Sequence, residues 1–204
     1  MKQLSNLKSI KGFMDPDEGE CLYRYSLEAS KKGPILEIGS YCGKSTIYIG
    51  TACKENNSLL YAIDHHTGSE ENQIGWEYHD EELFDSETGK INTFPEFRKN
   101  IRSFDLEKFV IPIVSDSVLV AKYWTINLSM VFIDGGHSEE AAFNDFDNWN
   151  DKIINNGFLA IHDVFPNPDD GGRPPYEIFL KAINSGKFKE YETVKSLKIL
   201  KKIL

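Results

Sequence analysis

Residues 35–46 read ILEIGSYCGKST, and this stretch decides the fold class. The apolar run at 35–38 is followed by a turn that contains Gly39 and Gly43, and then by a helical pattern from 44 to 55. A strand, a tight glycine turn and a helix in this order make up the first half of a βαβ unit, which is the building block of parallel sheets. The stretch therefore predicts an α/β protein, and it raises the question of what the turn binds.

The same alternation of short apolar runs and helical patterns continues along the chain. Further strands are expected at 59–63, 109–114, 128–133 and 158–161, with a terminal hairpin at 188–194 and 197–204. Helices are expected at 16–32, 44–55 and 176–184, and two more begin at Thr93 and Ser138. We predict a seven-stranded, mostly parallel sheet with helices on both faces. Because ligands of open α/β sheets bind at the carboxyl ends of strands, the acids that follow these strands are the candidate site.

A proline within the third predicted strand constrains the strand order. Pro112 has no N–H to donate to a ladder, so its strand is expected at an edge of the sheet. A sheet ordered 3-2-1-4-5-7-6 places the third strand at an edge.

Two helix boundaries are predicted from local signals. Thr93 and Glu96 have the spacing of a capping box at the start of a helix. The helix that begins at Ser138 is expected to include Ile153 on its apolar face and to end at 155–157.

The composition limits the classes of protein and partner. With 204 residues and 40% hydrophobic content, we expect one domain, 1–204, that begins with a helical segment at 1–32. A net charge of −9 argues against a nucleic-acid partner. Three cysteines without metal-binding spacing are typical of a reduced protein. We see no apolar leader and no stretch long enough to span a membrane, so we expect a cytoplasmic protein without a membrane partner. A homo-oligomer is left open.

The glycine turn does not have the spacing of a phosphate-binding loop. A P-loop reads GxxxxGK[ST], whereas Gly39 and Gly43 enclose three residues. The strand that ends at Asp134 imitates the magnesium-binding strand of such enzymes, so a P-loop-like nucleotide hydrolase stays open as a lesser alternative. The dinucleotide motif GxGxxG is absent as well, because Tyr41 stands where the second glycine is required.

The motif ExGxxxGxS at 37–45, followed by Asp64 at the end of the next strand, resembles the class I S-adenosylmethionine (SAM) dependent methyltransferases. The resemblance implies a Rossmann-like methyltransferase fold and SAM as the cofactor. SAM carries cationic groups and a ribose diol but no phosphate, which suits carboxylates beside a glycine turn. The residues implied in cofactor binding are Glu37, Gly39, Ser40, Gly43, Ser45, Asp64, His65, Asp116 and Ser117.

Two further stretches, VFIDGGHSE at 131–139 and GFLAIHD at 157–163, resemble small O-methyltransferases of the macrolide-sugar and cephamycin type, and more distantly catechol O-methyltransferase. The resemblance implies methyl transfer to an oxygen of a small-molecule acceptor, with Asp134 and His137 as catalytic residues and His137 as the general base. It also implies a divalent metal held by Asp134, His162 and Asp163.

His162 departs from that pattern, because the sugar-modifying relatives have an acid at this position. Magnesium prefers oxygen ligands, so the departure leaves open magnesium, a softer ion or no metal. A metal-free N- or O-methyltransferase and a SAM-binding module without catalysis therefore remain alternatives. His137 also has a non-catalytic interpretation, in which it caps the following helix or orients Asp134.

An insertion at 67–93 separates the second strand from the next helix. It mixes many acids with the aromatic residues Trp76, Tyr78 and Phe84, and it is either a cap over the acceptor pocket or a solvated segment or subunit contact. Just before it, one of His65 and His66 is expected to border the ribose, and His66 is a candidate to face the acceptor.

Overall fold

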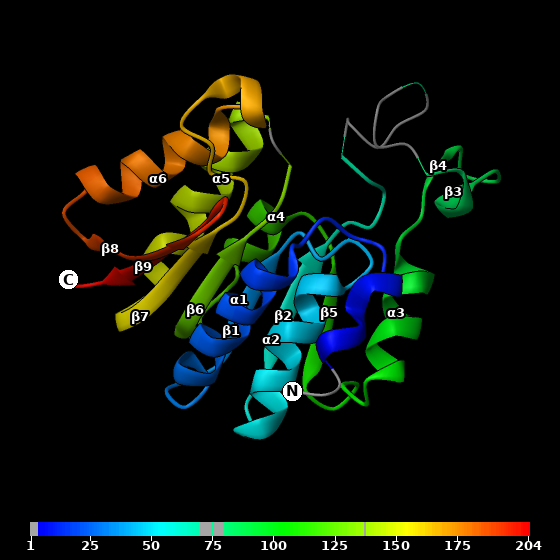
Figure 1. Cartoon of the computed structure of the whole chain (residues 1–204), viewed down its shortest axis with the longest axis horizontal. Helices are drawn as coiled ribbons and strands as arrows, with labels where there is room; N and C mark the ends of the chain where they lie inside the picture. The colour runs from blue at the N-terminus through cyan, green and yellow to red at the C-terminus, as the bar shows by residue number, and fades with distance from the viewer. Residues whose placement is uncertain (1–3, 70–74, 76–79, 137) are drawn as a thin grey trace.

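The computed structural model describes residues 4–69, 75, 80–136 and 138–204. In this part of the chain a seven-stranded sheet has the order β5-β2-β1-β6-β7-β9-β8, with β9 antiparallel to both of its neighbours (Figure 1). Its strands are β1 (Ile35–Ile38), β2 (Leu60–Asp64), β5 (Val110–Val114), β6 (Leu128–Ile133), β7 (Ile153–Ile161), β8 (Phe188–Val194) and β9 (Leu197–Lys202).

The observed strand order is the predicted one. The labels β3 (Phe84–Asp85) and β4 (Lys90–Ile91) belong to a separate two-stranded sheet, so the large sheet reads 3-2-1-4-5-7-6 when its own strands are counted. Pro112 lies in the edge strand β5 and pairs with Ala62 of β2, which confirms the edge position that a missing N–H requires.

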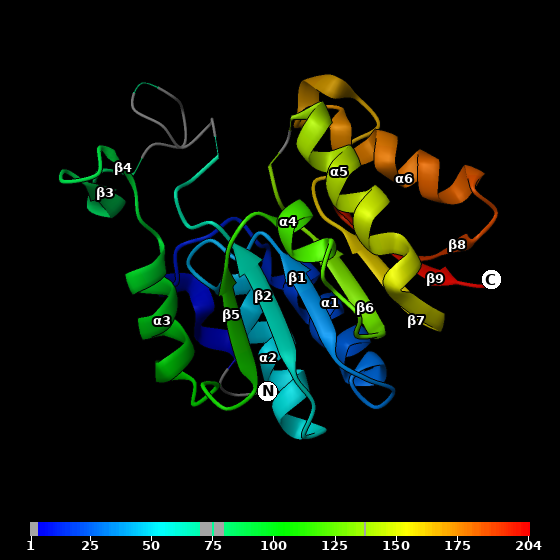
Figure 2. The same ribbon diagram turned by 180° about the vertical axis from the view of Figure 1, so that it is seen from behind.

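Helices cover both faces of the large sheet. Figure 1 shows one face, covered by α1 (Pro16–Ala29), α2 (Lys44–Glu55) and α3 (Phe94–Ser103). Figure 2 shows the opposite face, covered by α4 (Ser117–Ala121), α5 (Glu139–Trp149) and α6 (Pro174–Asn184). Because the parallel strands all point the same way, the loops that follow β1, β2, β5, β6 and β7 meet along one edge.

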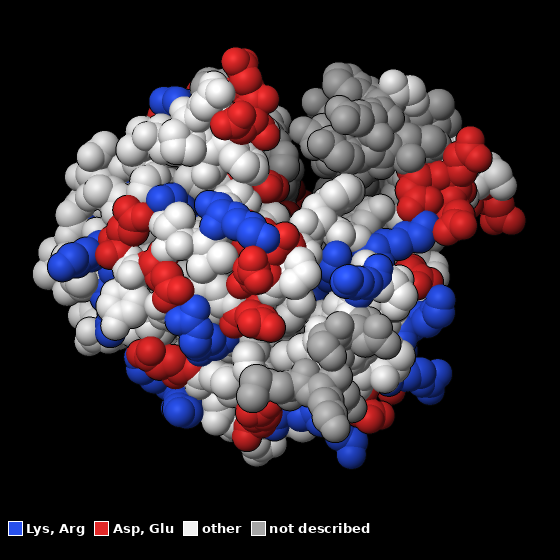
Figure 3. All heavy atoms as spheres, in the orientation of Figure 1, with Lys and Arg blue, Asp and Glu red and all other residues white. Residues whose placement is uncertain are grey.

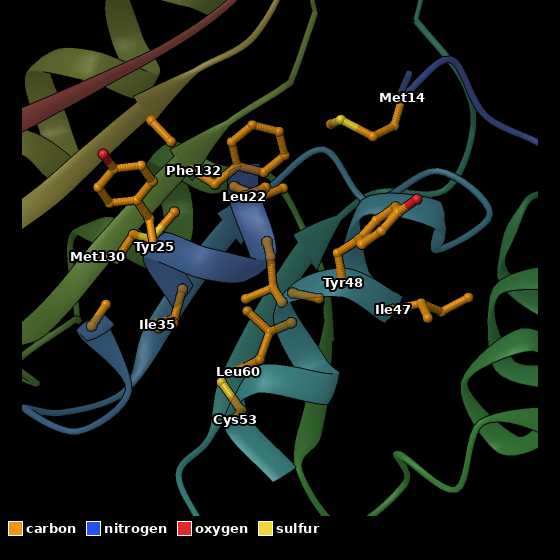
Figure 4. Close-up of a cluster of buried hydrophobic side chains, with 14 of the residues drawn as sticks. Met14, Leu22, Tyr25, Ile35, Ile47, Tyr48, Cys53, Leu60, Met130 and Phe132 are labelled. Carbon is orange, nitrogen blue, oxygen red and sulfur yellow. The ribbon is translucent and has the colours of Figure 1, made fainter. Parts of the chain in front are cut away.

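Hydrophobic side chains fill the space on both sides of the sheet. The cluster on the side of helices α1 and α2 includes Ile35 and Phe132 of the sheet and Leu22 and Ile47 of the helices, and all four are fully buried (Figure 4). On the opposite face, a second cluster includes the fully buried Trp149 of α5. Burial of large side chains of this kind stabilises the fold by about 1.5–3 kcal/mol for each one.

The predicted capping box at Thr93 is wrong. Thr93 is the N-cap of α3, but its side chain makes no cap hydrogen bond. Its hydroxyl lies instead 2.7 Å from Nδ1 of the buried His66, so a tertiary contact takes the group that a local signal assigns to the helix.

The predicted end of α5 is also wrong. The helix ends at Trp149, a 3-10 turn follows at Asn150–Lys152, and Ile153 begins β7 opposite Leu128. The carbonyl oxygens of Asn150 and Ile153 accept hydrogen bonds from the buried Lys202 ammonium of β9, at 3.2 and 2.8 Å. This contact, from the far end of the chain, satisfies carbonyls that a longer helix would have to pair internally.

Candidate functional site

The loop between β1 and α2 begins with a glycine that touches another strand end. Gly39 has φ +85°, and a Cβ atom there would stand 2.0 Å from the backbone oxygen of Asp134. β1 and β6 are neighbours in the sheet, with Ile38 opposite Ile133. Gly43, with φ +89°, then forms the N-cap of α2. The glycine loop therefore lies directly against the residues that follow β6.

Glu37 lies beneath this loop and not on its surface. Its side chain is fully buried, and its carboxyl group accepts hydrogen bonds from the hydroxyls of Ser45 and Thr46, both at 2.6 Å. Burial raises the pKa of Glu37 from 4.5 to about 8, against the opposing effect of the two hydroxyls. Glu37 is therefore mainly uncharged at neutral pH, and it ties β1 to the first turn of α2.

Asp64, at the end of β2, holds the loop from the side. One carboxylate oxygen accepts the backbone N–H groups of Ser40 and Tyr41 at 2.9 and 2.8 Å, and the other accepts the N–H of His66 at 2.6 Å. A carboxylate offers about four acceptor positions, so room remains for a ligand hydroxyl. The Ser40 hydroxyl is buried and has no hydrogen-bond partner among the described residues.

Asp116 and Ser117, which the resemblance implies in cofactor binding, follow β5. Asp116 is exposed, and its side chain caps α4 by accepting the N–H of Leu119 at 2.9 Å. The Ser117 hydroxyl donates to the carboxylate of Asp145 on α5, a residue that sequence reasoning missed. Burial raises the pKa of Asp145 to about 6. A signal for it existed, because Asp145 falls on the apolar face of α5 between Ala142 and Trp149.

The two histidines after Asp64 lie in different surroundings. His65 is exposed, with Nδ1 accepting the N–H of Thr67 at 3.1 Å. The His66 ring is buried and packs against Phe94 and Phe97 of α3. The His66 ring is therefore part of the packing between the end of β2 and α3.

The three predicted metal ligands lie together at the ends of β6 and β7. Nδ1 of His162 is 3.0 Å from Oδ1 of Asp134 and 3.2 Å from Oδ2 of Asp163. Each carboxylate side chain is 23% exposed, whereas that of His162 is 3% exposed. Asp163 has φ +54°, a left-handed conformation that is rare outside glycine and is often found at functional sites.

A fourth side chain, and the third acidic one, reaches this cluster from the N-terminal helix α1. Oε2 of Glu18 lies 3.1 Å from Nε2 of His162, and the Glu18 side chain is 4% exposed. Its other oxygen accepts the backbone N–H of Ser196 at 2.8 Å, in the turn between β8 and β9. No local sequence signal indicates this contact, because 144 residues separate Glu18 from His162.

The surrounding charges determine the protonation of His162. Burial disfavours a charged imidazole, but Asp134, Asp163 and Glu18 outweigh it and raise the pKa of His162 well above 6.5. Without a cation between the imidazole and these acids, both ring nitrogens of His162 are therefore protonated.

The cluster has the donor chemistry of a divalent-cation site. Among the described residues, Asp134, His162 and Asp163 are the grouping whose ligand atoms all lie within 4.8 Å of one another. Neighbouring ligands of an octahedral ion, each at about 2.1 Å from it, are about 3 Å apart, and the two measured separations from Nδ1 agree with that spacing. One nitrogen and two carboxylates fit the group, with the cation in place of the Nδ1 proton.

Comparison with known families identifies the class of protein. The model of a family described as a methyltransferase domain matches residues 36–164, from β1 to just after β7. The chain belongs to this methyltransferase family. Three of the four clustered side chains, Asp134, His162 and Asp163, and the whole glycine loop fall in the matched region, whereas Glu18 lies outside it.

Solved structures share the fold of this methyltransferase along nearly its whole length. Methyltransferase PaMTH1 from Podospora anserina, bound to S-adenosylhomocysteine, has a TM-score of 0.67 at 12% identity, with 93% of this chain and 80% of that chain covered. TomG from Streptomyces achromogenes, an O-methyltransferase in tomaymycin synthesis solved with SAM, has a TM-score of 0.66 at 13% identity, covering 99% and 86%. An O-methyltransferase from Bacillus cereus, solved with S-adenosylhomocysteine, has a TM-score of 0.64 at 15% identity, covering 98% and 86%.

The described helices include none with the length and apolar character needed to cross a membrane.

Some predicted residues of this methyltransferase lie outside the described residues. They are His137, Trp76 and Tyr78. Of the insertion, the described part includes Leu83 and Ile91, which pack with Cys42 of the glycine loop. Figure 3 shows acidic side chains gathered over the β3–β4 segment, namely Asp80, Glu81, Glu82, Asp85 and Glu87.

The contact between Gly39 and Asp134 can be tested with two glycine variants. Gly39→Ala is expected to destabilise the protein far more than Gly186→Ala, because both glycines have positive φ but only Gly39 meets backbone at 2.0 Å. Gly186→Ala should cost about 1–2 kcal/mol, the cost of a left-handed alanine. Chemical denaturation of the two variants measures the difference, and equal losses would contradict the proposed close contact.

The buried state of Glu37 predicts a pH dependence of stability. Between pH 4.5 and about 8 the folded protein keeps a proton on Glu37 that the unfolded chain releases, so this group lowers the stability as pH rises through that window. The slope is at most about 1.4 kcal/mol per pH unit. Glu37→Gln removes this contribution, so the stability difference between variant and wild type should change in the variant's favour from pH 5 to pH 8. The measurement is denaturant unfolding of both proteins without ligand at several pH values. If their unfolding free energies change with pH by the same amount, Glu37 is charged in the folded protein.

Proposed function

We propose that this methyltransferase transfers the methyl group of SAM to an oxygen of a small-molecule acceptor. The observation that carries the proposal is the contact between Gly39 and Asp134, which puts the glycine loop beside the Asp134–His162–Asp163 cluster. Methyl transfer requires donor and acceptor to be aligned in one site, and a shared edge of the sheet allows that. The O-methyltransferase names of two structural neighbours support the choice of oxygen.

The contacts of the loop favour a sulfonium donor over a polyphosphate. A P-loop surrounds phosphates with unpaired backbone N–H groups, but the amides of Ser40 and Tyr41 already donate to Asp64. The negative charge of Asp64 also repels phosphates, whereas it attracts cationic groups and accepts hydrogen bonds from ribose hydroxyls. We therefore place SAM along the loop from Gly39 to Gly43, with its ribose toward Asp64.

The chemical obstacle lies on the acceptor side, because the donor is already activated. The acceptor oxygen attacks the methyl carbon, the carbon–sulfur bond breaks with its electron pair left on sulfur, and the hydroxyl proton passes to a base. Lowering the acceptor pKa by about three units corresponds to about 4 kcal/mol. We propose His137 as the base, from its position three residues after Asp134 in the sequence.

We propose that Asp134, His162 and Asp163 hold a divalent cation, which would lower the pKa of the acceptor hydroxyl. The two carboxylates are partly exposed and so are accessible to an acceptor, whereas the buried His162 lies below them. The acids also keep this edge negatively charged, which disfavours anionic acceptors unless a cation is bound.

We also infer the kind of partner and the compartment. A net charge of −9 is unfavourable for contact with a nucleic-acid backbone, which supports a small-molecule acceptor. Cys21, Cys42 and Cys53 are unpaired and buried, which is consistent with a reducing, cytoplasmic location. The 67–93 insertion, which packs on the glycine loop through Leu83 and Ile91, is proposed as a cap over the acceptor.

Calorimetry with SAM and with ATP tests the ligand of the loop. We expect SAM to bind and ATP to give no binding heat. Asp64→Asn should weaken SAM binding about tenfold or more, equivalent to at least about 1.4 kcal/mol, because an amide cannot accept hydrogen bonds on both sides. Glu55→Gln at the far end of α2 is the matched control and should bind like wild type. Tight ATP binding without SAM binding would overturn the proposed function.

A pair of variants distinguishes His137 as the general base from His137 as a residue that only supports the start of α5. His137→Ala should lower kcat by about 10²–10⁴-fold while SAM affinity stays within about twofold. The side chain of Ser138 caps α5 by accepting the N–H of Ala141 at 3.2 Å. Ser138→Ala is therefore the control: it should cost about 1 kcal/mol of stability and keep its turnover. Equal loss of turnover in both variants would mean that His137 affects turnover by stabilising the start of α5 and not as a base.

A further inference from the structure

We propose that Glu18 is a positioning residue that fixes the tautomer of His162, so that Nδ1 is a ligand for a first-row transition-metal ion held with Asp134 and Asp163. The inference rests on the cation site of the proposed function and adds a residue outside the matched family region, together with the class of ion. It follows from the hydrogen-bond partners of the two Glu18 oxygens.

One oxygen of Glu18 is committed to donors. Oε1 accepts the N–H groups of Ser196 and Leu197 at 2.8 and 3.2 Å, and the Ser196 hydroxyl donates to it at 2.7 Å. Backbone N–H groups can only donate, so the atom at this position must be an acceptor. The Glu18 carboxylate therefore cannot rotate without leaving buried donors unpaired.

The other oxygen determines where the imidazole proton lies. Oε2 of Glu18 faces Nε2 of His162 at 3.1 Å, and a carboxylate oxygen accepts, so Nε2 carries a proton and donates it. The lone pair of the neutral ring then lies on Nδ1, which faces the oxygens of Asp134 and Asp163. Metal-binding histidines commonly donate their second N–H to a carboxylate in this way, which orients the ring and increases its basicity.

The local sequence explains how Glu18 reaches a strand end. Asp15 and Glu18 form the capping box of α1, which begins the helix at this point. Gly19 follows, and a Cβ atom there would stand 2.3 Å from the Tyr48 ring, so the glycine lets α1 lie close against α2. Lys195, in the turn between β8 and β9, pairs with Asp15 at 2.5 Å and holds that turn beside the helix start.

The donor set indicates the class of ion. Magnesium and calcium favour oxygen ligands, whereas an imidazole nitrogen favours later first-row ions such as Fe²⁺, Co²⁺ and Zn²⁺. A nitrogen fixed as a lone-pair donor by Glu18 adds affinity for these ions and little for magnesium. We therefore expect the intact protein to bind Co²⁺ more tightly than Mg²⁺.

A substitution with almost the same shape reverses the hydrogen bond to His162. In Glu18→Gln the amide oxygen must face the Ser196 and Leu197 donors, so the NH₂ group faces Nε2 of His162. Nε2 must then accept, and the ring proton moves to Nδ1, where it competes with the cation. The size of the side chain is kept, and among the described residues the one other contact that changes is the 3.4 Å hydrogen bond from the Asp15 N–H to Oε2 in the capping box of α1.

The measurement is a Co²⁺ titration of the full chain, followed by visible absorption, with Mg²⁺ titrated in competition. Glu18→Gln should bind Co²⁺ about 10–100-fold more weakly than wild type. The matched control is Glu192→Gln, since Glu192 also ties α1 to the terminal hairpin, through Arg24 and Tyr25, without touching His162. Unchanged Co²⁺ affinity in Glu18→Gln, or an equal loss in Glu192→Gln, would overturn the positioning role.

A second measurement on the wild type does not depend on the folding of a variant. With Zn²⁺ bound, ¹⁵N–¹H correlation spectra should show the proton of His162 on Nε2, and a proton on Nδ1 would overturn the inference. Absence of any Co²⁺ or Zn²⁺ binding by a protein that still binds SAM would overturn the inference while leaving the methyltransferase proposal in place. The SAM titration thus separates failure of one from failure of the other.

Discussion

The approach of the Gly39 backbone to the carbonyl oxygen of Asp134 is the constraint on which the site depends. Parallel pairing of β1 with β6 brings the two strand ends together, and a residue with a side chain would hold them apart. The glycine turn and the Asp134–His162–Asp163 cluster therefore form neighbouring parts of one edge. Proximity of this kind is what a transfer between two bound molecules requires.

The same edge concentrates acidic groups, and the fold stabilises each in a different way. Glu37 is kept mainly uncharged by burial beneath the loop. Asp64 is compensated by three backbone N–H groups. Asp134 and Glu18 lie on either side of His162, which carries the compensating charge. An unpaired buried carboxylate lowers the stability of the fold. These three arrangements therefore allow acidic groups to gather at the ligand-binding edge of the sheet in a stable protein.

Much of the fold could be predicted from the sequence because its signals are local. Apolar runs gave the strands, Pro112 gave the edge, and the turn at 39–43 gave the position of the site. The errors arose where distant residues compete with local signals: His66 takes the Thr93 hydroxyl, and Lys202 takes the carbonyls after α5. Glu18 could not be assigned from the sequence for the same reason, since its partners lie 144 and 178 residues away.

The most direct test is a crystal structure of the protein with S-adenosylhomocysteine and Mn²⁺, with anomalous data for manganese. We expect the nucleoside along the loop that begins at Gly39, and an anomalous peak enclosed by Asp134, His162 and Asp163 on the same edge of the sheet. A nucleoside bound in a different hollow from that cluster would contradict the claim that the glycine loop and the Asp134–His162–Asp163 cluster form one methyl-transfer site. Phosphoryl groups bound in the loop in a parallel ATP soak would contradict it as well.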